Sequence, residues 1–231
     1  AQNSLAAILV GSSPQPALAD FTQRAIQLGD DLWRGPFPAA AEHPASTPAD
    51  LTASAQTALA EGDQLRAQLG HYQGAMFWFD GEWYWGLDRL HLLEDRLQQE
   101  GYAAPGSSPV CPLPTGIATT ATGKNCSNVT LEYFPSLRSP YTAIGHPRVL
   151  ELIEHTGVTV RLRPVMPMLM RGIPAPREKQ NWIITDASRE ARFHKAPFGN
   201  FVDPFGDPVR RAFALFPAAE RLGKGMPFTT A

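Results

Sequence analysis

The sequence predicts an α/β protein, and two local signals carry that prediction. Asp80-Gly81 lies between the aromatic runs "MFWF" and "EWYW", a strong signal for a tight β-hairpin. The apolar runs at 129–134 and 158–164 flank a helical segment. Strand, helix and strand in that order predict two parallel strands joined by a right-handed crossover.

Helices are expected wherever apolar residues recur at helical spacing. The expected ranges are 18–35, 48–70, 86–99, 141–155, the larger part of 176–198, and 207–222. Thr47 fits an N-cap with Pro48 at the first helical position, and Gly157 fits the end of the helix before it. The last residues, "GKGMPFTTA", show no capped helix and no strand pattern.

Residues 101–128 are rich in Pro, Gly, Ser and Thr and lack periodicity, so they are expected to form a linker. We therefore divide the chain into 1–102, a linker at 103–128, and 129–231. The hairpin and its following helix belong to the first part, and the strand–helix–strand unit belongs to the second. A small sheet normally begins with the strand–helix–strand unit and is completed by the hairpin, so the order in this chain is unusual.

The composition, with 43% hydrophobic and 10% aromatic residues, is that of a globular protein able to bury a core. A net charge of -2 gives no reason to expect nucleic acid. No apolar run approaches the roughly 20 residues that a membrane helix needs, and no signal peptide is recognised. Cys111 and Cys126 are expected to be free thiols of a cytoplasmic protein, with a disulfide as the alternative.

The polar segment "PSLRSPY" at 135–141 lies where a strand ends and a helix begins. Ligands of open α/β sheets bind at that position. A helix N-terminus also favours an anion or a thiolate. Ser139 followed by Pro140 fits an ordinary N-cap as well, and the two interpretations are compatible.

Several short motifs resemble one family. They are Ser139-Pro140-Tyr141, Arg163-Pro164, "WGLDRL" at 85–90, and a helical series of Lys179, Trp182, Asp186, Arg189 and Ala191. Together with their surroundings, which cover roughly two thirds of the chain, they resemble 2-hydroxychromene-2-carboxylate isomerases, relatives of kappa-class glutathione transferases and DsbA-like proteins. The resemblance implies a thioredoxin-like fold with a helical insertion, its halves in permuted order. We expect the chain to be either a fragment of a tandem two-unit protein or a circular permutation of one unit. In either case the hairpin and the strand–helix–strand unit are expected to share one sheet. That sheet would form within the chain or by exchange between two chains.

The resemblance also implies glutathione as cofactor and an isomerase or transferase reaction on an aromatic or carboxylated small molecule. Ser139 would be catalytic, because its hydroxyl would orient the glutathione thiolate. The residues expected to contact glutathione are Arg138, Tyr141, Lys179, Trp182, Ala75, Met76, Leu87 and Asp88. Arg163 is a further candidate cation for a substrate carboxylate, with a solvated surface charge as the alternative. A homodimer is a possible assembly.

Three residues depart from the family pattern. Met76 stands where the family has a cis-proline, and a cis bond before Met costs about 2.5–4 kcal/mol, so a trans bond is expected. Leu87 replaces a serine and Trp182 replaces a tyrosine. These changes favour the alternative of a non-catalytic or degenerate thioredoxin-like binding module. A DsbA-like disulfide oxidoreductase is disfavoured because no cysteine lies near Ser139.

Overall fold

The computed structural model describes residues 49–111, 113 and 126–230, and a few single positions between 23 and 34. Contacts divide the chain into two compact units, 1–70 and 71–231. In the first unit, α3 (Ala49–Gln68) confirms the helix expected at 48–70. Of the helix expected at 18–35, only positions 23, 26, 27, 29, 30 and 34 are described, and they are helical. Half of the linker expected at 103–128 lies outside the described residues.

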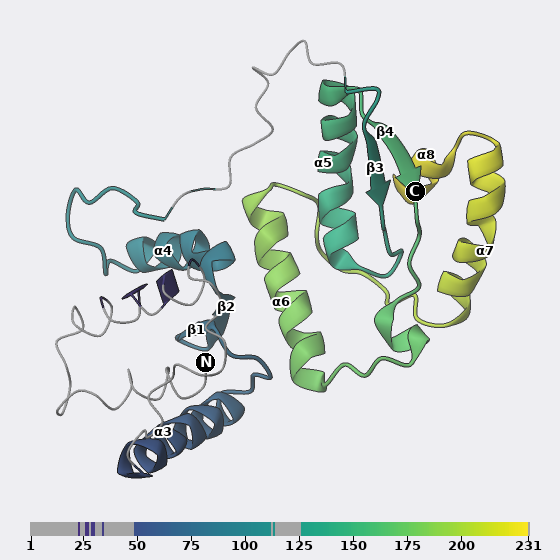
Figure 1. The fold of residues 1–231 in the computed structure, drawn as a ribbon. Coiled ribbons are helices and arrows are strands. Elements are labelled where there is room, and N and C mark those ends of the chain that lie inside the picture. The colour runs from purple at the N-terminus through teal and green to yellow at the C-terminus, as the bar shows by residue number, and fades with distance from the viewer. Residues whose placement is uncertain are drawn as a thin grey trace. The chain divides into compact units, whose positions relative to one another are not determined.

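The second unit begins with the predicted hairpin (Figure 1). Strands β1 (Met76–Phe79) and β2 (Glu82–Trp85) are antiparallel, and Phe79 faces Glu82 across the turn. Asp80 and Gly81 have φ values of 42° and 82°, the left-handed conformation that a two-residue turn of this kind requires. A short 3-10 helix, η1 (Leu87–Arg89), then leads into α4 (Leu90–Gln99).

The strand–helix–strand unit is also confirmed. Strands β3 (Thr130–Tyr133) and β4 (Thr159–Leu162) are parallel, and the helix α5 (Pro140–Thr156) connects them. Ser139 caps the start of α5, and Gly157 ends the helix with a φ of 66°. That left-handed conformation costs glycine little, because it lacks a Cβ.

The rest of the unit is helical: η3 (Met168–Arg171), α6 (Arg177–Phe193), α7 (Asp207–Arg221) and α8 (Gly225–Thr230). The helix α8 was not expected from the sequence. It forms because tertiary contacts hold a short segment of weak helical pattern. Phe228 packs edge-on against Phe216 of α7, and Thr230 lies 3.0 Å from Nε2 of the buried His146 on α5.

A small apolar core joins α5 to α6. Ile144, Ala187 and Ala191 are buried, and Tyr141, Ala196 and Phe198 pack against them. The alanines allow the two helices to approach closely, which places the first turn of α5 beside the middle of α6.

The described residues form two separate two-stranded sheets, so the expected single sheet is not formed within this chain. The helix α6 lies between them, since it packs on α5 and also contacts β2 (Figure 1). The Trp83 carbonyl of β2 accepts a hydrogen bond from Arg189 of α6 rather than from a further strand. Exchange of strands between two chains stays a prediction.

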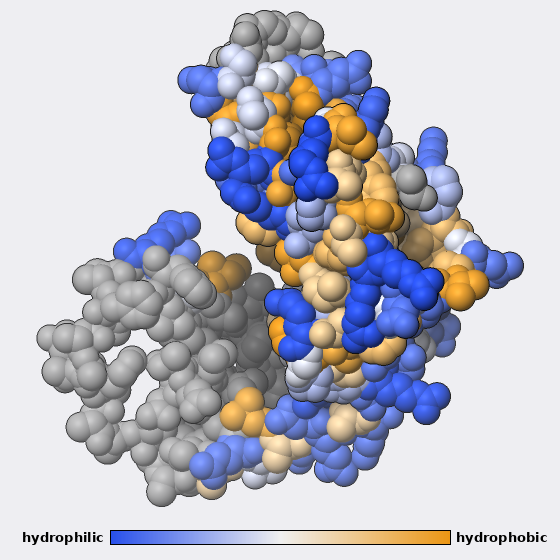
Figure 2. Space-filling view, turned by 90° about the vertical axis from the view of Figure 1, so that its right-hand side faces the viewer, coloured by the Kyte–Doolittle hydropathy of each residue, from blue (hydrophilic) through white to orange (hydrophobic). Residues whose placement is uncertain are grey.

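Apolar and charged residues are interspersed on the face turned to the viewer in Figure 2. The exposed apolar residues of α7 and the segments beside it are Phe201, Val202, Phe205, Leu215 and Leu222. In the part of the chain that is described, no helix is long and apolar enough to cross a membrane.

Candidate functional site

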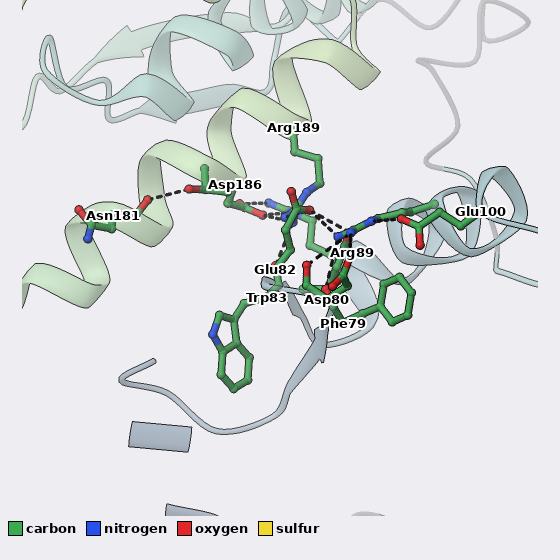
Figure 3. Close-up of polar contacts among 12 residues, drawn as sticks. Phe79, Asp80, Glu82, Trp83, Arg89, Glu100, Asn181, Asp186 and Arg189 are labelled. Carbon is green, nitrogen blue, oxygen red and sulfur yellow. Dashed lines mark hydrogen bonds and ion pairs between the residues drawn. The ribbon is translucent and has the colours of Figure 1, made fainter. Parts of the chain in front are cut away.

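A buried carboxylate on α6 connects three elements. Asp186 is fully buried, and Arg89 of η1 donates two hydrogen bonds to it, of 2.9 and 3.0 Å (Figure 3). The hydroxyl of Tyr141, in the first turn of α5, donates a third, of 2.8 Å. Asp186 therefore holds the segment after the hairpin against the beginning of α5. Arg89 and Asp186 are 97 positions apart in the chain.

Arg189, one turn after Asp186, binds the hairpin itself (Figure 3). It donates to the Trp83 carbonyl and to Glu82, each over 3.0 Å, and its guanidinium stacks on the Tyr84 ring at 4.1 Å. Burial acts to raise the pKa of Glu82. The Tyr84 hydrogen bond and the charges of Arg189 and Arg96 outweigh it, so that this pKa lies below its usual value. The carboxylate stays ionised and the hairpin stays attached to α6.

Tyr141 is one of the residues expected to contact glutathione, and its hydroxyl points to Asp186. Burial and the Asp186 charge raise the pKa of Tyr141 far above its ordinary value. The phenol is therefore neutral at physiological pH. Its role in this arrangement is to fix the first turn of α5.

Ser139 is an N-cap in the structure. Its Oγ accepts a hydrogen bond from the backbone N–H of Thr142 over 3.3 Å. The Thr142 hydroxyl in turn accepts from the backbone N–H of Ser136, which fixes the preceding loop. The described residues offer no acceptor for the Ser139 hydroxyl proton, so this half-buried group can still donate to a ligand.

Both candidate arginines already have carboxylate partners. Arg138 forms two hydrogen bonds to Asp203, of 2.7 and 2.8 Å, and lies over the Phe205 ring. Arg163 pairs with Glu132 at 2.8 Å on the exposed face of the sheet. These contacts neutralise both side chains, so neither offers a free charge to a substrate carboxylate.

Lys179 and Trp182 lie on the N-terminal half of α6, in an aromatic cluster with His71, Tyr72 and Trp85. The Lys179 ammonium is 5.6 Å from the centre of the Tyr72 ring, and the Trp182 ring stands edge-on to Trp85 at 5.6 Å and to His71 at 5.9 Å. Trp182 is only 9% exposed, and its buried Nε1 has no hydrogen-bond partner among the described residues. The resemblance alone did not predict this unpaired donor.

The remaining expected residues lie at the base of the hairpin. The described residues contain no cis peptide bond, which confirms the trans bond before Met76. The Ala75 carbonyl accepts from the Gly86 N–H over 3.0 Å, and Met76 faces Trp85 across the strands. Leu87 and Asp88 are exposed, the former by 83%.

The structure links a few of the expected residues indirectly, through contacts that the sequence did not identify. Tyr141 and Arg89, the residue after Asp88, both donate hydrogen bonds to Asp186. Trp182 packs against Trp85, which lies opposite Met76 in the hairpin. Arg138 points instead to Asp203 on the loop before α7. Arg89 and Asp186 were visible in the motifs, but nothing local in the sequence showed that they pair.

Neither a metal centre nor a disulfide is found in the described part of the chain. His, Cys, Asp and Glu side chains there form no group of three that could hold a metal ion. Cys111 and Cys126 are free, as expected. Comparisons with protein-family models, curated proteins and solved structures found no match to this chain.

Proposed function

We propose that residues 71–230 act as a glutathione-dependent isomerase or transferase on an aromatic or carboxylated small molecule, with a thioredoxin-like sheet completed by exchange between two chains. The observation that carries the proposal is the Arg89–Asp186–Tyr141 contact. It ties the segment after the hairpin to the first turn of α5, and the family resemblance assigns glutathione contacts to both. A bidentate, charge-assisted pair holds such groups in a defined geometry.

Ser139 is the proposed catalytic residue. Its Oγ accepts from Thr142, and the hydroxyl proton remains available to a thiolate at the positive end of α5. The thiolate would add to an electrophilic carbon of the substrate and form a sulfur–carbon bond. After rearrangement that bond breaks, the electron pair returns to sulfur, and glutathione is released unchanged.

A non-catalytic thioredoxin-like binding module is the second candidate. Specific observations favour it: Asp203 neutralises Arg138, and Leu87 leaves an exposed apolar side chain where the resemblance expects a serine. Such a module would bind glutathione and turn over no substrate.

Calorimetric titration of the whole chain with glutathione tests the proposal. Heat of binding is expected, and a flat titration at millimolar glutathione refutes both glutathione-binding candidates. Ser139→Ala then separates the two candidates. Under the catalytic proposal it should lower turnover of 2-hydroxychromene-2-carboxylate about a hundredfold or more, since one positioned donor to a developing anion is worth about 2.7–4 kcal/mol.

Ser107→Ala is the matched control, because Ser107 is exposed and lies outside the site. It should leave both glutathione binding and turnover unchanged. Glutathione binding by a wild-type chain that turns over no isomerase or transferase substrate would favour the binding module instead.

A further inference from the structure

We propose that Trp182, Lys179 and Tyr72 form a subsite for the carboxylate of an aromatic ligand. This assignment rests on the proposed function, and it gives Lys179 and Trp182 to the substrate carboxylate in place of the glutathione contact that the resemblance implies. It begins from the buried indole N–H of Trp182, which has no acceptor among the described residues.

The three side chains provide hydrogen-bond donors, and the only acceptor that the described residues offer them is the weak one of the Met168 sulfur, 3.9 Å from the Lys179 ammonium. An ammonium and an indole can only donate, and a phenol donates readily. The Tyr72 hydroxyl has no hydrogen-bond partner in the described part of the chain. The nearby Asp186 carboxylate already accepts from Arg89 and Tyr141. A ligand that supplies only acceptors would satisfy this set.

The charge of the cluster points to an anion. Lys179 has no carboxylate partner among the described residues, and its ammonium lies between the Tyr72 ring and the Met168 sulfur, 3.9 Å away. Two of the cations beside this cluster are already paired: Arg89 with Asp186, and Arg189 with Glu82. A carboxylate matches one ammonium and the neighbouring N–H and O–H donors.

The burial of the Trp182 indole also indicates that a ligand completes this cluster. Trp182 is more than nine-tenths buried, and native proteins seldom leave a buried polar group without a partner. Its ring stands edge-on to Trp85, which is 39% exposed, so the cluster reaches the solvent at Trp85. The flat face of an aromatic ligand fits against such rings. The indole N–H also restores a donor where the resemblance expects a tyrosine.

Calorimetric titration of the whole chain with benzoate tests the subsite, with benzamide as the neutral isostere. Benzoate is expected to bind with a dissociation constant on the order of 1 mM, and benzamide about tenfold more weakly. Lys179→Met and Trp182→Phe should each weaken benzoate about tenfold, because each removes a hydrogen bond to a charged acceptor. Tyr72→Phe should weaken it less.

Lys224→Met and Trp78→Phe are the matched controls, an exposed lysine and a half-exposed tryptophan elsewhere in the same unit. Both should bind benzoate as the wild type does. Thermal melts confirm that each variant is folded. If Trp182→Phe fails to fold, Lys179→Met and Tyr72→Phe decide the result.

The subsite is refuted if the wild type does not bind benzoate, or if Lys179→Met binds it as tightly as Lys224→Met does. Because benzoate has no thiol, this outcome is independent of the glutathione titration. Glutathione binding without benzoate binding refutes the subsite alone, and failure of both refutes the proposed function as well.

Discussion

Replacing Arg89 by Met should destabilise the protein severely, because it leaves the Asp186 carboxylate buried without its main cation. Asp186 is fully buried, and Arg89 provides two of the three hydrogen bonds that it accepts. Breaking a buried pair by removing one partner costs about 3–5 kcal/mol. Arg189, whose Nη1 is 3.9 Å from Asp186, offsets part of this, so we expect a loss near the lower value.

Urea unfolding at neutral pH, followed by circular dichroism, measures this loss. The double variant Arg89→Met/Asp186→Asn should regain at least about 1.5 kcal/mol, because it removes the uncompensated charge and keeps an acceptor for Tyr141. Arg210→Met is the control, since its pair with Asp207 is exposed and worth about 0–1 kcal/mol. A loss below about 1 kcal/mol for Arg89→Met, or no recovery in the double variant, would show that this contact does not hold the unit together.

Three further outcomes are expected. Gly225→Ala should cost about 1–3 kcal/mol of unfolding free energy, because the added Cβ would lie 2.7 Å from Cδ1 of Leu162; an unchanged denaturation midpoint would contradict that packing. Burial lowers the pKa of His91 below its ordinary value of 6.5. As the pH drops below 6.5, His91 therefore takes up a proton in the unfolded state before it does so in the folded state, and the free energy of unfolding falls. His91→Leu should make the urea midpoint depend less on pH in that range. Ser139→Ala should remove about 1 kcal/mol of stability by loss of the N-cap, whatever it does to turnover; unchanged stability would mean that the cap is not formed.

The elements that the sequence predicted well are those specified by local signals. Asp80-Gly81 favours the two-residue turn, Ser139-Pro140 begins α5, and Gly157 ends it. Each depends on the conformations open to one or two residues. The helix α8 was missed because its six residues lack such a signal and depend on contacts with α5 and α7.

The candidate site was predictable only in part. Ser139, Tyr141, Lys179 and Trp182 stand in recognisable motifs, but a motif does not give the partner of a side chain. Arg138 was expected to contact a ligand, and Asp203, 65 positions away, binds it instead. The unpaired Trp182 donor likewise depends on which rings pack around it.

The sequence by itself determined the hairpin, the parallel strand–helix–strand unit and most of the helices, because turn residues, caps and periodic apolar positions act over a few neighbours. The tertiary structure alone decided that Arg89 meets Asp186 across 97 positions, and that α6 lies between two small sheets in place of one larger sheet. A buried charge needs a partner, and that partner can come from any part of the chain that the fold places beside it. A local sequence pattern does not specify such a contact between distant segments.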